Sequence, residues 1–414
     1  MNILYIAYSC DPFNGSEDKI GWNVPFANEK LGNNVYIITK EEQRKNIEEY
    51  CKKNNYSKMK IYYVDIPEFY KSVFKGAFYS GRLGIWNKKA YKIAIDICEK
   101  EKIDIIHQIT PIEFRAIGDY GKISNTKFVL GPLGGGERIP VELKKYCKKY
   151  NCLEGVRYLL NKFYRWSNLK KNKYKFCDYI MFANKETYDF ISETSKELPQ
   201  NEIYLEFGIE DEEIEELKSV QHNNKNKEKN AFNILVAGRL NYRKGHLLLF
   251  DALKQISDKL DYEVSIVGDG PNRKKIKKYL RANKEIEKHV KIKGNIEYEK
   301  MKYEYDKADI LVMPSLRETS GNVMLEAIRN GVPVIAMKKF GAANFLNSDI
   351  GWLYDGKTQK EITKDLSKKI SEAMMNSKRL ELKGTKCREY AKKYEWSTRV
   401  QHYNRIYNSI LNKK

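Results

Sequence analysis

Apolar runs with the length of strands alternate with segments of helical period along the first half of the chain. Short apolar runs bounded by turn residues are typical of buried strands, and apolar residues every three or four positions are typical of helices. The predicted strands of this half are residues 2–8, 34–39, 60–66, 103–109, 127–132 and 178–183. The predicted helices are residues 22–32, 88–100 and 183–195. This order of elements predicts right-handed βαβ units and a parallel sheet.

The same alternation begins again in the second half of the chain. Its predicted strands are residues 232–238, 262–268, 289–296, 309–315 and 333–337. Its predicted helices are residues 246–260 and 271–280. We therefore expect an α/β fold with two doubly wound parallel sheets. Neither half has a clean dinucleotide fingerprint, because Arg273 stands where the third glycine of GDGPNR would be, and a dehydrogenase is disfavoured.

A change of composition separates the two halves. Residues 208–230 are rich in Asn, Lys and Glu and have little to bury, which is typical of a linker. We predict a first domain over residues 1–207, a linker over 208–230 and a second domain over 231–392. The tail has apolar positions at helical spacing, so residues 393–414 are predicted to form a C-terminal helix.

Composition excludes several classes of protein. With 414 residues, 42% hydrophobic and 12% aromatic, the chain has enough apolar material for two domains and is not disordered. No run approaches the roughly 20 apolar residues of a membrane-spanning helix, and the start has no basic leader or cleavage site. Seven cysteines without a C-x-x-C pair predict free thiols in a reducing compartment. We therefore expect a cytoplasmic protein.

A formal net charge of +21 requires an explanation in terms of partners. One explanation is a lysine-rich proteome, since Lys, Asn, Ile and Tyr are all abundant. Others are attraction to anionic lipid, phosphate ligands or nucleic acid. No helix-turn-helix, RNA-recognition or zinc-finger signature is present, so nucleic acid is not an expected partner.

The most informative segment is LRETSGNVMLEAIRNGVPVIA, residues 316–336. Its polar turn follows a predicted buried strand and precedes a predicted helix, which places it at the carboxyl end of a parallel strand, where open α/β sheets bind ligands. Gly321 lets a phosphate approach the backbone. Glu318 precedes the helix and Glu326 lies more than a turn inside it, so their carboxylates should reach different parts of one elongated ligand. A nucleotide sugar has this shape.

Five segments in one order resemble the retaining glycosyltransferases of family 4, which have the GT-B fold. Residues 316–336 are similar to the family's Glu-x7-Glu signature, AGRLNYRKG (237–245) to its G-R-L-x-x-x-K-G segment, and VGDGPNR (267–273) to its G-x-G-P turn. YSCDPFNGSEDKIGWN (8–23) and GPLGGGERIP (131–140) resemble the C-x-P-x-x-G-S-E and G-P-x-G-G-G-E segments of one subgroup. Order and spacing agree over roughly residues 1 to 355.

The resemblance implies two Rossmann-like domains that face a cleft, with the C-terminal helix crossing back onto the first domain. It implies that the second domain binds the nucleotide sugar and the first the acceptor. It assigns Glu318 to the hydroxyls of the transferred sugar and Glu326 to the ribose. Thr319, Ser320, Gly321 and Asn322 would offer amides and hydroxyls to the phosphates and the sugar. A surface acid and a helix salt bridge are the alternatives for the two glutamates.

Arg239 and Lys244 follow the first strand of the second domain, beside Gly238, where both could reach the diphosphate. Positive charge there would stabilise the negative charge that grows on the leaving pyrophosphate. The alternative is that both only solvate a loop. No Asp-x-Asp pair occurs, so positive side chains must replace a metal ion, and we expect metal-independent chemistry without a cofactor.

The first domain is expected to contribute three sets of residues. Gly15 and Ser16 follow its first strand, and Gly135, Gly136, Glu137 and Arg138 follow its fifth. A generic surface turn is the alternative for the first set, and a tight turn with flanking salt-bridged charges is the alternative for the second. His107 ends the fourth strand, and the resemblance suggests contact with the donor sugar, whereas a core histidine is the alternative. The second histidine that the family often has two positions further on is replaced by Ile109.

Residues 141–175 hold eleven Lys or Arg and two acids, interleaved with aromatic residues. Such a mixture at helical spacing suits the headgroup region of an anionic membrane. The alternative is ordinary amphipathic helices on a sheet with solvated lysines. The acceptor would then be a lipid-linked glycan, and the protein would lie at the inner face of the membrane.

The leading interpretation is a retaining hexosyltransferase of bacterial surface polysaccharide synthesis. It would transfer a sugar from a nucleoside diphosphate, which is its substrate and not a cofactor, to a glycan acceptor. Two alternatives stay open: a noncatalytic GT-B binding or partner subunit, and a nucleotide-sugar epimerase or glycogen-type synthase.

Overall fold

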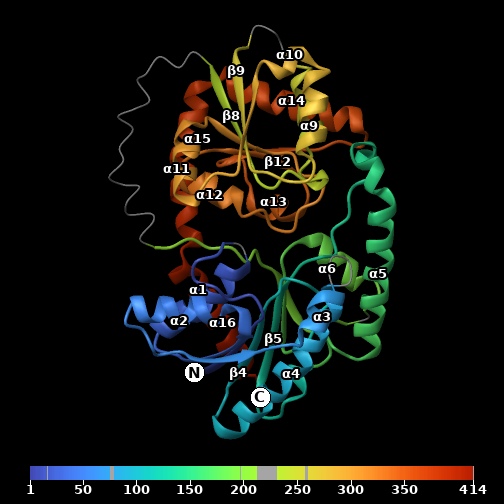
Figure 1. Cartoon of the computed structure of the whole chain (residues 1–414). Helices are drawn as coiled ribbons and strands as arrows, with labels where there is room; N and C mark the ends of the chain where they lie inside the picture. Colours follow the sequence, from blue (N-terminus) through green and yellow to red (C-terminus); the bar gives the residue numbers. More distant parts are fainter. Residues whose placement is uncertain (16, 75–78, 196, 212–230, 257–259, 414) are drawn as a thin grey trace. The chain divides into compact units, whose positions relative to one another are not determined.

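The computed structural model describes residues 1–15, 17–74, 79–195, 197–211, 231–256 and 260–413. The chain divides into two units (Figure 1). The first unit consists of Met1–Glu137, Gly155–Gly208 and Trp396–Lys414, and the second of Arg138–Glu154 and Ile209–Glu395. Among the described residues, no helix is both long enough and apolar enough to cross a membrane.

The sheet of the first unit has seven parallel strands over the described residues, in the order β3-β2-β1-β4-β5-β6-β7. The strands are β1 (Asn2–Ala7), β2 (Asn34–Lys40), β3 (Lys60–Val64), β4 (Ile105–Thr110), β5 (Lys127–Leu133), β6 (Tyr179–Phe182) and β7 (Gln200–Ile203). The α-helices are α1 (Glu17–Lys30), α2 (Arg44–Lys53), α3 (Glu68–Val73), α4 (Tyr79–Lys100), α5 (Asn151–Lys170), α6 (Lys185–Ser192) and α16 (Trp396–Leu411).

Alternate side chains of these strands enter two apolar layers, because successive residues of a strand point to opposite faces. Leu4 and Ile6 of β1 pack with Trp86 of α4 on one face. Ile3 and Tyr5 pack with α1 and α16 on the other face. The C-terminal helix is thus part of the core of the first unit.

The sheet of the second unit has six parallel strands over the described residues, in the order β10-β9-β8-β11-β12-β13. The strands are β8 (Phe232–Ala237), β9 (Tyr262–Val267), β10 (Val290–Gly294), β11 (Ile310–Met313), β12 (Val334–Met337) and β13 (Gly351–Tyr354). The α-helices are α8 (His246–Leu253), α9 (Arg273–Arg281), α10 (Lys284–Glu287), α11 (Tyr298–Lys307), α12 (Val323–Arg329), α13 (Phe340–Phe345), α14 (Gln359–Met375) and α15 (Ser377–Ala391). The predicted α/β class with two doubly wound parallel sheets is confirmed.

One part of the expected first domain belongs to the second unit, so the boundary 1–207 needs correction. Residues Arg138–Glu154, which include the 3-10 helix η4 (Val141–Tyr150), group with the second sheet. Leu143 is fully buried in its core. The Tyr146 hydroxyl donates to Asp251 at 2.8 Å. A partner far along the chain therefore fixes this segment, and local spacing does not reveal such a partner.

The predicted linker lies mostly outside the described residues, which end at 211 and resume at 231. Of its described start, Gly208 belongs to the first unit, and the second unit begins at Ile209, whose amide donates to the Tyr394 carbonyl at 2.8 Å. The predicted C-terminal segment 393–414 is also divided: its helix begins at Trp396, and Glu395 still belongs to the second unit.

Candidate functional site

The candidate site lies at the carboxyl edge of the second sheet, where the strand order reverses. The chain runs from β8 to β9 and β10 on one side and then returns to place β11, β12 and β13 on the other. The loops after β8 and β11 leave neighbouring strands at this point. Ligands of open α/β sheets bind in the crevice that such a reversal creates.

The loop after β8 is held against the end of β11 by a glycine. Gly245 has φ +65°, and a Cβ placed on it would lie 1.9 Å from the Pro314 carbonyl oxygen. No other residue type fits there without a backbone shift. The 3-10 turn Tyr242–Lys244 therefore lies over the first residues beyond β11. This contact directs Lys244 toward the neighbouring loop.

Lys244 and Glu318 form an ion pair across the two loops. The Ser315 hydroxyl also donates to the Glu318 carboxylate, at 3.2 Å. Burial would raise the pKa of Glu318, but the Lys244 ammonium and these hydrogen bonds outweigh it, and the pKa is lowered. Glu318 is therefore ionised at neutral pH. Both side chains keep some exposure, 20% for Lys244 and 17% for Glu318, so a ligand can reach them.

The other cation expected at this edge, Arg239, is exposed. Its guanidinium has no hydrogen-bond or ion-pair partner among the residues that the structure describes. Gly238, which precedes it, has φ +133° and lies beside the Lys244 side chain. The loop after β8 thus brings a free arginine and a paired lysine to one strand end.

A second glycine loop packs on the loop after β8. Gly268 follows β9 with φ +130°, and a Cβ on it would lie 2.2 Å from the Gly238 carbonyl oxygen. The Leu240 amide donates to the Asp269 carbonyl at 2.9 Å. The backbones of the loops after β8 and β9 are therefore in direct contact at this edge of the sheet, with no side chain between Gly238 and Gly268.

The loop after β11, from Thr319 to Asn322, is fixed on both sides. Gly321 has φ +84°, and a Cβ on it would meet the Met313 sulfur at 3.0 Å. The Gly341 amide donates to the Thr319 carbonyl at 3.0 Å. Ser320 is buried, whereas Thr319 and Asn322 are partly exposed. The four predicted residues therefore stand beside Glu318 in one ordered loop.

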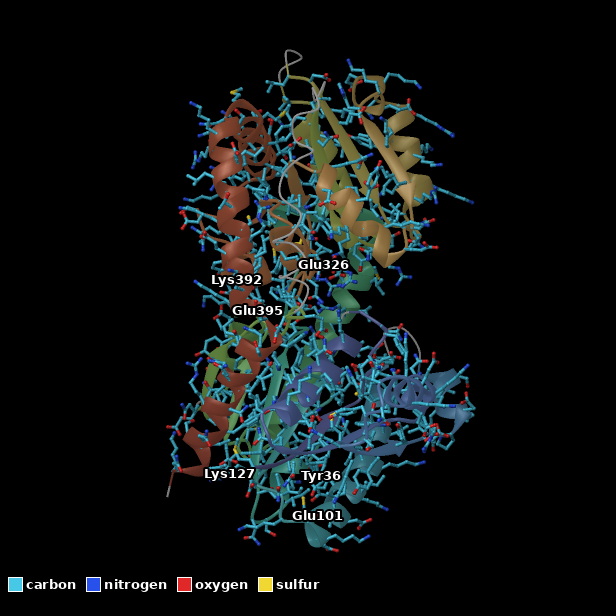
Figure 2. All side chains as sticks on the ribbon, turned by 90° about the vertical axis from the view of Figure 1, so that its left-hand side faces the viewer. Tyr36, Glu101, Lys127, Glu326, Lys392 and Glu395 are labelled. Atoms are coloured by element: carbon cyan, nitrogen blue, oxygen red, sulfur yellow. The ribbon has the colours of Figure 1, made fainter. Side chains whose placement is uncertain are left out.

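Glu326 lies in the first turn of the following helix, α12 of the second unit (Figure 2). The Tyr305 hydroxyl of α11 donates to its carboxylate at 2.8 Å. Tyr305 is 2% exposed, and no motif in the sequence marked it. It orients the carboxylate while leaving it partly exposed.

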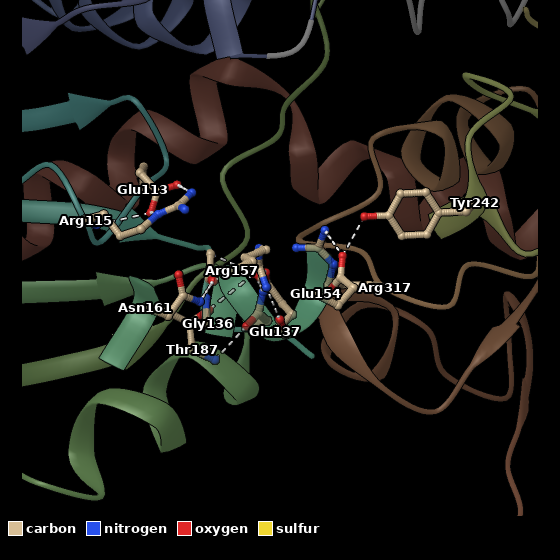
Figure 3. A network of polar contacts seen from close by, with 12 residues as sticks. Glu113, Arg115, Gly136, Glu137, Glu154, Arg157, Asn161, Thr187, Tyr242 and Arg317 are labelled. Carbon is tan, nitrogen blue, oxygen red and sulfur yellow. Dashed lines mark hydrogen bonds and ion pairs between the residues drawn. The ribbon is translucent and has the colours of Figure 1, made fainter. Parts of the chain in front are cut away.

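Two stacked tyrosines and an ion pair attach the segment Arg138–Glu154 to the rest of the second unit. Tyr150 stacks on Tyr242 with a centroid distance of 4.0 Å and an interplanar angle of 11°. Arg317 donates to Glu154 at 3.1 Å, and the Tyr242 hydroxyl donates to the same carboxylate oxygen at 2.6 Å (Figure 3). Because Tyr242 and Arg317 flank Lys244 and Glu318 in sequence, this network braces both loops of the candidate site.

The glycine loop of the first unit is anchored from within, which corrects the expected role of Glu137. This side chain is 1% exposed, and its carboxylate accepts from the Gly135 amide at 3.0 Å and from Asn184 at 2.7 Å. Arg157 donates to the carbonyls of Gly135 (2.6 Å) and Glu137 (2.8 Å) (Figure 3). Glu137 thus holds the loop and does not face a substrate.

The remaining residues of this loop differ in how exposed they are. Gly136 is buried, and its amide donates to the Thr187 hydroxyl at 3.2 Å, while Gly135 is partly exposed. Arg138 is exposed but belongs to the second unit. Arg157 and Asn161 of α5, which no motif singled out, supply the hydrogen bonds that shape the loop.

Of the expected pair after β1, Gly15 is exposed and Ser16 lies outside the described residues. A Cβ on Gly15 would meet nothing within 4 Å, so the space around it does not require glycine. Glu17, at the start of α1, accepts from the Ile112 amide at 3.2 Å. Burial, together with the nearby Glu113 carboxylate, raises the pKa of Glu17 to about 7, although the Ile112 amide opposes the shift.

His107 occupies the core of the first unit, which is the alternative that the sequence left open. It is 0% exposed. Its Nε2 donates to the Gly131 carbonyl at 2.8 Å, and its Nδ1 accepts from the Tyr407 hydroxyl at 2.6 Å. Burial lowers its pKa to about 4, so the ring is neutral at physiological pH. With both nitrogens engaged, His107 joins β4 to the C-terminal helix.

Comparison with known proteins supports a glycosyltransferase. The family model of glycosyl transferases group 1 matches residues 218–394. An uncharacterized glycosyltransferase of Methanocaldococcus jannaschii is 27% identical over 205 residues, 48% of this chain and 56% of that protein. The lipopolysaccharide 1,2-N-acetylglucosaminetransferase of Salmonella typhimurium is 26% identical over 227 residues, 52% of this chain and 53% of that protein. The chain thus spans about half the length of these relatives.

A solved structure extends the similarity to both units. The Anabaena protein HepE in complex with UDP is 14% identical, covers 99% of this chain with 100% of its own, and has a TM-score of 0.64. At this identity the likeness shows the fold alone. The fold is GT-B, as the sequence predicted.

Proposed function

We propose that this chain is a hexosyltransferase that transfers a sugar from a nucleoside diphosphate to a glycan acceptor. The observation that carries the proposal is the Lys244–Glu318 ion pair at the β8–β11 reversal point. It lies within the region that the family model of glycosyl transferases group 1 matches. The UDP complex of HepE, which has the same fold, supports a nucleoside diphosphate as the donor's leaving group.

In this proposal the two cations of the loop after β8 bind the diphosphate. Arg239 has no competing partner among the described residues, and its planar guanidinium can take two phosphate oxygens at once. Lys244 supplies a compact charge beside the bond that breaks. Both stabilise the negative charge that develops on the leaving group, which lowers the barrier to transfer.

The two glutamates bind hydroxyl groups. Glu318 is ionised and accepts hydrogen bonds, so it suits the hydroxyls of the transferred sugar. Glu326, oriented by Tyr305, suits the ribose hydroxyls. Thr319, Ser320, Gly321 and Asn322 connect the two positions in sequence and complete the donor site.

Three finer features belong to the proposal. The sugar keeps its anomeric configuration, with a phosphate oxygen of the donor taking the acceptor's proton. The reaction needs no metal ion, since two cations already neutralise the diphosphate. The acceptor is a lipid-linked glycan of bacterial surface polysaccharide synthesis, and the enzyme works at the cytoplasmic face of the membrane. The lipopolysaccharide relative supports this class of acceptor.

The experiment that tests the proposal is a donor screen. The protein is incubated with UDP-, GDP- and ADP-linked hexoses, with and without polyprenyl-linked glycan acceptors, and released nucleoside diphosphate is measured. We expect release from one nucleotide series, faster with an acceptor than without. Binding of nucleoside diphosphate without release from any donor would instead support a noncatalytic binding subunit.

A further inference from the structure

Over the part of α5 that belongs to the first unit, the buried side chains are polar, while Tyr158, Tyr164 and Leu169 pack against the core as partly buried residues. The buried residues of α5 are Asn161, Arg165 and Asn168. Asn161 donates to the Gly135 carbonyl at 2.8 Å and Asn168 to the Phe114 carbonyl at 2.9 Å. Arg165 pairs with Glu193 at 2.7 Å. A helix that only covers a sheet normally turns its polar face to water, so the outward face of α5 requires its own explanation.

That outward face carries four large apolar side chains. Val156 is 45% exposed, Leu159 65%, Phe163 56% and Trp166 56%. They recur at steps of three, four and three residues, which places them in one stripe along the helix, opposite the buried face. Helix α5 lies on the outside of the first unit (Figure 1). Single exposed apolar residues are ordinary, but a continuous stripe indicates an interaction surface.

Among residues 155–171 the exposed charged residues are lysines, whereas Arg157 and Arg165 pair with Glu137 and Glu193. Residues 155–175 contain seven Lys or Arg and no acidic residue. Lys162, Lys170 and Lys171 are exposed. The Lys162 ammonium lies 4.8 Å from the Tyr158 ring and the Lys170 ammonium 5.1 Å from the Trp166 ring. The two ammonium groups therefore lie over aromatic rings of the same helix.

We infer that the outward face of α5 docks on an anionic lipid surface. Apolar residues in a stripe, aromatic residues among them and lysines at the border match a helix that lies in the plane of a membrane interface. Negative headgroups attract the lysines, and the stripe enters the boundary of the acyl chains. A second copy of the chain fits this face less well, because it would bring two positively charged borders together.

The docking surface is narrower than the segment 141–175 that the sequence suggested. Lys144, Lys145, Lys148 and Lys149 lie on η4 of the second unit, and Lys145 is 3.5 Å from Asp251. The apolar stripe lies on the first unit. The inference is independent of the donor chemistry, since none of its residues belongs to the proposed donor site.

The test is sedimentation of the full chain with vesicles of phosphatidylglycerol and phosphatidylcholine, and with vesicles of phosphatidylcholine alone. The variant Leu159→Ser/Phe163→Ser/Trp166→Ser removes the stripe. The control is Leu382→Ser, since this leucine of α15 is 58% exposed but lies in the other unit. All four substituted residues are exposed, so these substitutions leave buried contacts intact. The melting temperatures of both variants should therefore stay close to that of the wild type.

We expect the wild type and Leu382→Ser to bind anionic vesicles at low salt, and the triple variant to bind at least tenfold more weakly. Lys162→Glu/Lys170→Glu/Lys171→Glu should also lose binding, and salt should weaken the wild type. Equal binding of wild type and triple variant, or equal binding to neutral vesicles, would overturn the inference. So would a wild-type dimer that the triple variant converts to monomers in solution, because a second copy would then occupy the stripe.

Discussion

Lys244 and Glu318 form an ion pair although 74 positions separate them in the chain. Each follows one of two neighbouring parallel strands, β8 and β11, and the pair closes over the point where the strand order reverses. Gly245 makes the contact sterically feasible, because any Cβ there would strike the Pro314 carbonyl. The pair therefore links the predicted phosphate loop to the predicted sugar loop.

Replacing Glu318 by glutamine should separate binding from catalysis. The amide can still accept from Ser315 but leaves the Lys244 charge unpaired, so the affinity for nucleoside diphosphate should stay the same or rise. Transfer should fall by about 100-fold or more, because an ionised partner of the sugar is lost in the transition state. Calorimetric titration and initial rates measure the two effects. Wild-type turnover in this variant would show that Glu318 does not bind the transferred sugar.

Chelation of divalent metals should leave transfer largely intact. Arg239 and Lys244 supply the positive charge that a metal ion would otherwise bring to the diphosphate. The measurement is the initial rate before and after dialysis against EDTA. Complete loss of transfer that magnesium or manganese restores would contradict the proposed role of the two cations.

Glu17 should make the first unit less stable as pH rises from about 5 to about 7. Its folded pKa is raised to about 7 from the ordinary 4.5, so the folded state holds a proton that the unfolded state has already released. Stability falls wherever the folded state binds more protons. Glu17→Gln cannot lose that proton, so its melting temperature relative to wild type should be higher at pH 8 than at pH 5. A difference that does not change with pH would contradict the raised pKa.

Arg157→Met should destabilise the first unit by about 3 kcal/mol, because it leaves the buried Glu137 carboxylate without its cation. Urea unfolding measures the decrease in the free energy of unfolding. The matched control is Lys185→Met, whose ion pair with Asp189 is exposed on both sides and should contribute less than about 1 kcal/mol. An equal, small decrease in the free energy of unfolding in both variants would show that Arg157 does not stabilise the glycine loop.

The periodicity of apolar residues predicted eleven of the thirteen described strands, because strands buried on both faces are continuous apolar runs between polar turns. It missed β7 and β13, which are short strands at the sheet edges. Lys244 and Glu318 were each expected at the carboxyl edge of the second sheet, since carboxyl ends of parallel strands share one edge, but the ion pair between them was not predicted. Local spacing could not show that Arg138–Glu154 would leave the first unit. Its partners, Asp251 of α8 and Asn272 at the start of α9, are more than a hundred residues away.

The two errors at single residues also have a physical cause. Glu137 and His107 have the residue types of a site, but each is buried, with every described partner internal. Whether a polar side chain at a strand end faces water or the core depends on the helices that cover it. For His107 that helix is α16, 300 positions further along the chain at Tyr407.

The central claim is that the loop after β8 binds the diphosphate of a donor, and the most direct test is calorimetric titration of Lys244→Ala. Wild type and the surface control Lys386→Ala, which loses only an exposed pair with Asp349, should bind the nucleoside diphosphate of the active donor series with equal Kd. Lys244→Ala should bind the diphosphate at least tenfold more weakly, while its affinity for the matching monophosphate changes far less. Equal diphosphate affinity in all three proteins would contradict the account.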